Sequence, residues 1–326
     1  MQSKARIFDQ PQPLVERMIM NVEKVIVGKR ETIEKAFVAM LSGGHLLLED
    51  VPGVGKTMLV RALARTIGCE FKRIQCTPDL LPSDVTGVSV YNAKSGEFEF
   101  RPGPLMTPIV LADECNRTSP KTQAAFLEAM EEKRVTIDGI GYELPKPFLL
   151  LATQNPADYE GTYALPEAQM DRFLMRLTIG YPTMEQEIQM LDRLQDRQPL
   201  EYLKPVIVQD EFVELQREAA RVHVDETLKE FIVRAALTTR QHPDLYLGVS
   251  PRASYALMRA AQSSAYMRGR TFVVPDDIKD YVLPVWAHRL MLTSEARMTG
   301  KSAEAILIGL LSSLQTPVLR YSSSSK

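Results

Sequence analysis

The sequence lacks the features that define several protein classes. Its longest apolar stretch in the C-terminal part, residues 305–311, is far shorter than the roughly 20 residues that span a bilayer. The first residues, MQSKARIFDQPQP, contain no apolar core of signal-peptide length. The chain has only 3 cysteines, an odd number, and their spacing matches no metal site. We therefore expect a cytoplasmic protein with reduced thiols and no membrane span.

An excess of charge of one sign is also lacking. The 39 Lys and Arg residues nearly balance the 41 Asp and Glu residues, which gives a net charge of -2. A dedicated nucleic-acid binder usually shows a basic excess or a basic stripe, so we expect no nucleic-acid partner. The 4 histidines are scattered and form no metal-like pair. With 326 residues, the chain is long enough for two domains.

The first part of the chain has the pattern of an α/β fold. Short apolar runs at 46–48, 109–112 and 148–152 alternate with longer helical patterns, which is typical of parallel strands covered by helices on both faces. Two further pairs of segments, 88–91 with 97–100 and 135–137 with 140–144, predict β-hairpins. Asp138-Gly139 is a strong tight-turn signal in the second pair. Surface decoration is the alternative interpretation of both hairpins.

The pattern changes after residue 181, where amphipathic helices follow one another. They are expected at 184–197, 210–221, 225–240, 251–267 and 275–289. We therefore predict an α/β domain at 1–181 and an all-helical domain at 182–326. The run Ser322–Ser325 is expected to belong to a disordered tail.

The most informative segment is LLLEDVPGVGKTMLVRALA, in which an apolar strand leads through a glycine loop into a helix. Gly53 and Gly55 let backbone N–H groups wrap phosphate oxygens. Lys56 supplies a positive charge for the β- and γ-phosphates, and the Thr57 hydroxyl is a ligand for Mg²⁺. The residues expected to contact the nucleotide are Gly53, Val54, Gly55, Lys56, Thr57 and Met58.

One position departs from the usual G-x-x-x-x-G-K-[ST] pattern of such loops. Asp50 stands where the first glycine is expected. The position follows directly on the strand, where a residue other than glycine can be accommodated.

Two adjacent acids, Asp113 and Glu114, follow the apolar run 109–112. In a parallel sheet, the functional edge is the one at which the strands have their carboxyl ends. Asp113 is therefore the candidate metal ligand, and Glu114 is the candidate base that deprotonates the attacking water. The alternative is that both acids are exposed and cap a helix at 120–132.

Together, these segments resemble the MoxR family of AAA+ ATPases. The resemblance rests on GHLLLEDVPGVGKT, FEFRPGPL, IVLADECNRTSPKTQAAFLEAMEE, LLATQNP, LPEAQMDRF and GVSPRA, in this order. It implies ATP and Mg²⁺ as cofactors, a homo-oligomeric ring that is expected to be a hexamer, and chaperone-like remodelling of partner proteins. Partners with von Willebrand factor A domains and metal-cofactor insertion are typical of such systems.

The resemblance also assigns roles to single residues. Asn155 matches the sensor 1 amide that contacts the attacking water or the γ-phosphate, although an Asn before a proline is also a common turn cap. Arg172 resembles the arginine finger that reaches the nucleotide of a neighbouring subunit. Arg176, four residues later, is the alternative candidate for this finger. Arg252 matches the sensor 2 residue that contacts the γ-phosphate within one subunit. For both Arg172 and Arg252, an ordinary surface arginine is the alternative.

A segment near the N-terminus completes the predicted site. Val27 and Gly28 resemble the residues that pack against adenine in related ATPases, and a simple turn between two helices is the alternative. Two other functions stay open from the residues: a nucleic-acid-associated AAA+ motor, and a nucleotide-gated binding module with little turnover.

Overall fold

The computed structural model describes residues 11–155, 163, 165–196, 199–315 and 317. The chain forms two compact units. Residues Glu16–Leu215 form the sheet unit, and the described residues from Gln216 onward form the lid unit together with Pro11–Val15. The predicted tail at Ser322–Ser325 lies outside the described residues.

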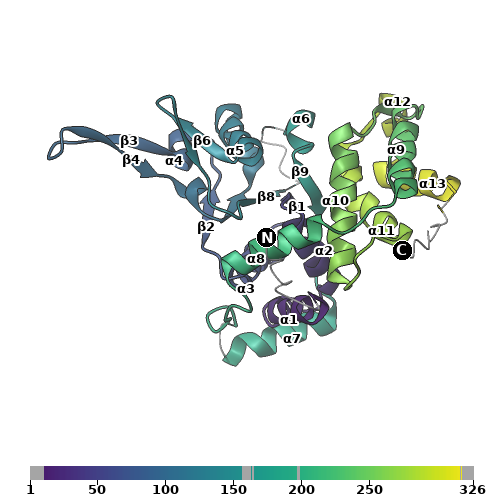
Figure 1. The fold of residues 1–326 in the computed structure, drawn as a ribbon, viewed down its shortest axis with the longest axis horizontal. Helices are drawn as coiled ribbons and strands as arrows, with labels where there is room; N and C mark the ends of the chain where they lie inside the picture. The colour runs from purple at the N-terminus through teal and green to yellow at the C-terminus, as the bar shows by residue number, and fades with distance from the viewer. Residues whose placement is uncertain (1–10, 156–162, 164, 197–198, 316, 318–326) are drawn as a thin grey trace, which may run out of the picture. The chain divides into compact units, whose positions relative to one another are not determined.

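A parallel β-sheet is the centre of the sheet unit (Figure 1). Its 5 strands lie in the order β2-β5-β8-β1-β9. They are β1 (His45–Glu49), β2 (Phe71–Gln75), β5 (Ile109–Asp113), β8 (Leu149–Gln154) and β9 (Phe173–Leu177). The central strands are buried on both faces. The apolar runs therefore predicted β1, β5 and β8 correctly, whereas β2 and β9 were not predicted. Exposed polar residues interrupt β2.

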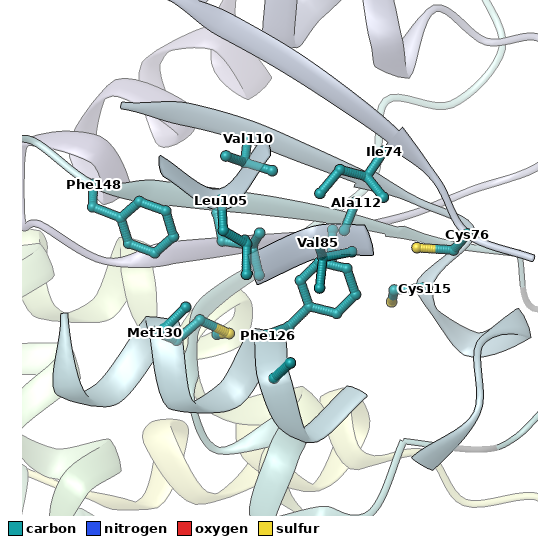
Figure 2. Packing of buried hydrophobic residues seen from close by; sticks show 14 of the residues in the cluster. Ile74, Cys76, Val85, Leu105, Val110, Ala112, Cys115, Phe126, Met130 and Phe148 are labelled. Carbon is teal, nitrogen blue, oxygen red and sulfur yellow. The ribbon is translucent and has the colours of Figure 1, made fainter. Parts of the chain in front are cut away.

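Helices cover both faces of this sheet. Side chains alternate between the two faces of a strand, so Val110 and Leu150 point to the same face. They join a buried cluster with Phe126 and Met130 of α5 (Pro120–Glu132), which Figure 2 shows below the strands. On the other face lie α2 (Arg30–Leu41), which contacts β1 and β9, and α3 (Lys56–Thr66), which contacts β2 and β5.

Both predicted hairpins are present. The first consists of β3 (Gly87–Asn92) and β4 (Glu97–Pro102), and the second of β6 (Arg134–Ile137) and β7 (Ile140–Glu143). The first projects as a long antiparallel ribbon in Figure 1. The rings of Phe100 and Tyr142 stack with their centroids 4.0 Å apart, and this contact joins the two hairpins. Phe98 near the turn is 73% exposed.

The other elements of the chain up to Ala220 are short or peripheral. They are α1 (Pro11–Glu23), α4 (Pro82–Thr86), α6 (Glu167–Met170), α7 (Met184–Asp196), α8 (Gln209–Ala220) and the 3-10 turns Pro104–Met106 and Cys115–Arg117.

The two compact units divide between Leu215 and Gln216, later in the chain than the boundary expected at 181–182. Backbone contacts explain why the intervening residues group with the sheet. The N–H of Val206 donates to the carbonyl of Thr66 at the end of α3 (2.9 Å), and the Gln186 side chain of α7 donates to the carbonyl of Gly28 (3.2 Å). Whether the functional lid starts at residue 182 stays a prediction.

The lid unit is mainly helical, as predicted. Its elements are α9 (Glu226–Arg240), α10 (Pro251–Met267), α11 (Pro275–Trp286), the 3-10 turn Ala287–Arg289, α12 (Ser294–Met298), α13 (Ala303–Ser313) and a short antiparallel pair, β10 (Leu245–Leu247) and β11 (Met291–Leu292). Ser250 caps α10 by accepting a hydrogen bond from the N–H of Ala253 (3.1 Å). The buried Trp286 indole donates to the Ala253 carbonyl (3.0 Å).

One buried carboxylate organises the start of α11. Asp277 is 0% exposed, and its oxygens accept two hydrogen bonds from Arg270 (2.6 Å each) and one from Arg268 (2.9 Å). The Ser264 hydroxyl (3.1 Å) and the N–H of Val274 (3.0 Å) also donate to it. A buried charge with this many donors is compensated within the lid unit itself.

Candidate nucleotide-binding site

The glycine loop connects β1 to the N-terminus of α3. Gly53 (φ 86°) and Gly55 (φ 94°) have the left-handed backbone that a side chain would strain. The first turn of α3 consists of Lys56, Thr57 and Met58. The backbone N–H groups of a first helical turn have no acceptor within the helix. A loop of this shape directs backbone N–H groups and the positive end of a helix dipole toward an anion.

The Lys56 ammonium lies over the start of the same loop. It donates to the backbone carbonyls of Asp50 (2.5 Å) and Val51 (3.1 Å). Burial lowers the pKa of Lys56 from its usual value, and the negative charges of Asp50, Asp113 and Glu114 act in the opposite direction. The charges of both predicted carboxylates therefore favour the protonated form of Lys56.

The first of these carboxylates, Asp113, is the last residue of β5 and is 7% exposed. One carboxylate oxygen accepts from the Thr153 hydroxyl (2.5 Å), and the other accepts from Arg73 Nε (2.8 Å) and Nη2 (2.6 Å). Helix α5 is capped by Ser119, whose hydroxyl accepts from the N–H of Thr122 (3.4 Å). Asp113 is therefore neither exposed nor the cap of α5, so the alternative interpretation of this residue is wrong.

The backbone of Glu114 is left-handed (φ 58°, ψ 47°), which is uncommon for a residue other than glycine. Its N–H donates to the Thr153 hydroxyl (2.7 Å), and its Oε2 accepts from Gln75 (3.2 Å) and Arg117 (3.0 Å). Strained backbone of this kind is concentrated at functional sites, where the surrounding contacts maintain it. Thr153 fixes both acids, because it accepts from Glu114 and donates to Asp113.

Asn155 lies at the same edge of the sheet. It follows β8 directly and is 7% exposed. The preceding residue, Gln154, accepts a hydrogen bond at its carbonyl from the N–H of Asp50 (3.3 Å), so the end of β8 is next to the start of the glycine loop. The strand ends thus bring the loop, the acid pair and Asn155 together.

Val27 and Gly28 form the turn between α1 and α2. Val27 is buried, and Gly28 has a left-handed backbone (φ 68°). A Cβ atom at Gly28 would lie 2.2–2.6 Å from atoms of the Gln186 side chain, so α7 packs closely against this turn. The role of both residues toward adenine stays a prediction.

A Mg²⁺ ion fits the donor set at this edge. Mg²⁺ is usually held by one or two protein oxygens together with phosphate oxygens and waters. The Thr57 hydroxyl and the Asp113 carboxylate are donors of this kind. The described residues contain no cluster of three or more His, Cys, Asp or Glu that could hold a metal ion.

Comparison with known proteins shows the family of the chain. Residues 45–175 match the model for an ATPase family associated with various cellular activities, and residues 237–308 match an AAA lid domain. Chaperone MoxR1 of Mycobacterium tuberculosis is 40% identical over 93% of this chain and 82% of its own length, and protein MoxR of Paracoccus denitrificans is 30% identical over 82% of this chain and 86% of its own. The chain belongs to the MoxR family of AAA+ ATPases.

Two further relatives agree with this assignment. The uncharacterized protein YeaC of Bacillus subtilis is 56% identical over 94% of this chain and 96% of its own length. A crystal structure of a candidate ATPase from Cytophaga hutchinsonii superimposes with a TM-score of 0.88 at 37% identity, over 94% of this chain and 96% of that one. The MoxR-family chain is therefore an ATPase with a nucleotide-binding sheet domain and a helical lid.

The predicted arginines of the MoxR-family chain have different surroundings. Arg172 follows α6 and pairs with Glu131 through Nε (2.8 Å) and Nη2 (2.7 Å). Arg176 lies on β9 and pairs with Glu49 at the end of β1 (2.8 Å), beside the glycine loop of its own chain. Arg252 is exposed in the first turn of α10 in the lid unit. None of these contacts tests the roles of the arginines, which stay predictions.

Sequence reasoning missed three side chains that contact the acid pair: Arg73, Gln75 and Thr153. Arg73 and Gln75 lie on β2, whose mixed composition concealed the strand. Thr153 ends the apolar run of β8, and a hydroxyl at the carboxyl end of a central strand was the available signal. No helix among the described residues is long and apolar enough to cross a membrane.

Proposed function

We propose that this chain is a Mg²⁺-dependent AAA+ ATPase that forms a homo-oligomeric ring, expected to be a hexamer, and remodels partner proteins. The observation that carries the proposal is that Lys56 and the acids Asp113 and Glu114 lie at or after the carboxyl ends of β1 and β5, which lie on either side of β8 in the parallel sheet. Lys56 neutralises phosphate charge, Asp113 and Thr57 hold the cation, and Glu114 accepts the proton of the attacking water. When bound, Mg²⁺ neutralises the charge that develops on the phosphate oxygens.

The name of the relative MoxR1 supports the chaperone part of the proposal. The exposed aromatic tip of the first hairpin supports it further, since Phe98 and Tyr91 (57% exposed) offer apolar contact area to a client. The proposed partner class is proteins with von Willebrand factor A domains, with metal-cofactor insertion as one outcome. Gly53, Val54, Gly55 and Met58 are proposed to line the phosphates, and Val27 and Gly28 the adenine.

A shared site between subunits is the part of the proposal with the sharpest test. Arg172 follows α6 and pairs with Glu131 of α5, whereas Arg176 pairs with Glu49 at the end of β1, directly before its own glycine loop. Arg172 is therefore the better candidate for the finger that reaches a neighbour. Asn155 and Arg252 are proposed to contact the γ-phosphate within one subunit.

The test measures the steady-state ATPase rate against protein concentration for wild type, Glu114→Gln, Arg172→Ala and an equimolar mixture of the two variants. We expect each variant to lose about 100-fold or more in turnover. The mixture should recover activity, because some sites receive an intact Glu114 from one subunit and an intact Arg172 from the next. Arg297→Ala, an arginine of α12 in the lid, is the matched control and should retain wild-type activity. Full activity of Arg172→Ala at all concentrations would contradict the shared site.

A further inference from the structure

Asp50, the residue at the position of the usual first glycine, holds a second segment of the chain. One of its carboxylate oxygens accepts hydrogen bonds from the N–H groups of Ile179 (2.7 Å) and Gly180 (2.6 Å). The other oxygen accepts from the N–H of Val51 (2.9 Å). Hydrogen bonds from backbone N–H groups to a carboxylate are short and strong, so Asp50 fixes residues 178–183, which we call the linker, against the glycine loop.

The main chain of Asp50 connects this contact to the phosphate-binding lysine. Its carbonyl accepts the hydrogen bond from Lys56 Nζ (2.5 Å), and its N–H donates to Gln154 (3.3 Å). A phosphate that attracts the ammonium of Lys56 competes with this carbonyl for the same donor. Movement of Lys56 therefore changes the contacts of the residue that holds the linker.

The linker is also fastened at its other end. Lys29 Nζ donates to the carbonyl of Tyr181 (2.8 Å), and the Gln186 side chain donates to the carbonyl of Gly28 (3.2 Å). The linker and the start of α7 thus contact both the glycine loop and the turn at 27–29. These are the two segments that are proposed to hold the phosphates and the adenine of one nucleotide.

A role in loop shape alone does not account for a carboxylate at position 50. Glycine, the usual residue at this position, would permit the backbone conformation of the loop. It would also add no negative charge beside a phosphate site. The charge of Asp50 acts on Lys56. The Asp50 carboxylate adds the hydrogen bonds to the linker. These bonds offset the repulsion between the carboxylate and a bound phosphate.

We propose that Asp50 is a positioning residue that couples nucleotide binding in the glycine loop to the conformation of the linker. The coupling is reciprocal, because a bound phosphate changes the linker and a fixed linker changes the geometry of Lys56. The inference rests on the proposed nucleotide site. It assigns Asp50 no contact with the reacting atoms.

The test is hydrogen–deuterium exchange of the full-length protein, with and without ADP and a non-hydrolysable ATP analogue. In the wild type we expect the nucleotide to protect residues 51–58 and to change exchange in the linker. In Asp50→Gly, residues 51–58 should still be protected, while the linker response should fall about tenfold. Asp50→Asn should give an intermediate response, because one amide oxygen can serve Ile179 and Gly180 while the amide nitrogen faces the N–H of Val51. The affinity for nucleotide should change in the same order, because the coupling between linker and glycine loop is reciprocal.

Asp84→Asn is the matched control, since this carboxylate also accepts a backbone N–H, that of Leu81 (2.8 Å), in the same unit. It should respond as the wild type does. A wild-type linker response in Asp50→Gly, or no linker response in a wild type that binds nucleotide, would overturn the inference. Absence of protection at 51–58 in the wild type would instead overturn the proposed nucleotide site. If Asp50→Gly fails to fold, the comparison of Asp50→Asn with Asp84→Asn decides.

Discussion

The sheet unit and the lid unit each contain a buried aspartate that is paired with arginine, and the two sites differ in how they are closed. Asp277 of the lid is 0% exposed and receives donors from two arginines, a serine and a backbone N–H. Asp113 of the sheet unit is 7% exposed and receives donors from Thr153 and from Arg73, whose side chain is 47% exposed.

The difference shows that burial and pairing alone do not indicate what a carboxylate does. Asp277 accepts five hydrogen bonds from four residues of the lid unit, so the loss of the half-exposed Arg268 would still leave it paired with Arg270. The main donor to Asp113 is half in solvent and can leave at small cost, since exposed ion pairs contribute little. Asp113 is therefore suited to exchange Arg73 for a cation.

The largest effect that tests this comparison is on stability. We expect Asp277→Ala to lower the free energy of unfolding by about 3–5 kcal/mol, because it removes the buried carboxylate that pairs with Arg270 and accepts from Ser264 and from the N–H of Val274. Urea denaturation followed by circular dichroism measures the change. The control is Asp280→Ala, which removes an exposed partner of Arg268 and should cost less than about 1 kcal/mol. Similar losses for both variants would contradict the structural role of Asp277.

The next effect is on activity. Asp113→Asn removes the charge that is proposed to hold Mg²⁺, which contributes several kcal/mol to catalysis, so turnover should fall by at least about 100-fold. The free energy of unfolding should change less than in Asp277→Ala. Titration of Mg²⁺ against nucleotide affinity is the second measurement, and the response should move to higher Mg²⁺ concentration, because Thr57 and the phosphates remain as ligands. An Asp113→Asn variant with the Mg²⁺ requirement of the wild type would break the comparison.

A smaller effect is expected at Arg73. Arg73→Ala removes the donor that competes with a cation for Asp113, so half-maximal activity should be reached at a lower Mg²⁺ concentration. The loss of stability should be about 1 kcal/mol or less, because the guanidinium is half exposed. Arg134→Ala, which breaks the exposed pair with Glu132 in the same unit, is the control and should leave the Mg²⁺ dependence unchanged. A higher Mg²⁺ requirement in Arg73→Ala would show that Arg73 supports the metal instead.

The smallest effect tests whether the thiol of Cys115, two residues after Asp113, is accessible to solvent in the folded protein. Burial raises the pKa of Cys115 and of Cys69 to about 12. A thiol in an unfolded chain has a pKa of about 8.5, so the folded state binds these protons more strongly. The resulting stability is lost as the pH rises from about 8.5 toward 12. At pH 8, iodoacetamide should not modify either thiol until the protein unfolds, as mass spectrometry can show. Fast modification of folded Cys115 would indicate an accessible thiolate.

Much of the fold and the site could be predicted from local patterns. The runs that became β1, β5 and β8 are continuous and apolar, and the glycine spacing before Lys56 has few other structural meanings. The missed features depend on side chains that meet only in three dimensions. Strand β2 is mostly exposed and polar, with Ile74 as its one buried residue, and only its pairing with β5 brings Arg73 to Asp113.

At position 50, the sequence showed an aspartate in place of the usual glycine, but it did not show which residues this aspartate contacts. The departure from glycine was visible, and its partners at 179–180 lie 129 and 130 residues away in the chain. No local pattern links positions at such a separation. The sheet order, with β9 beside β1, is what makes them neighbours.

The stacked pair of Phe100 and Tyr142 has a mechanical consequence. Two ribbons that were joined only at their bases would swing separately, whereas the ring contact braces the long ribbon β3–β4 against the shorter ribbon β6–β7. A force on the tip near Phe98 would therefore act on both hairpins together. Helix α5 leads directly into β6 and begins a few residues after Glu114. Such a force would therefore reach the segment that carries the proposed base.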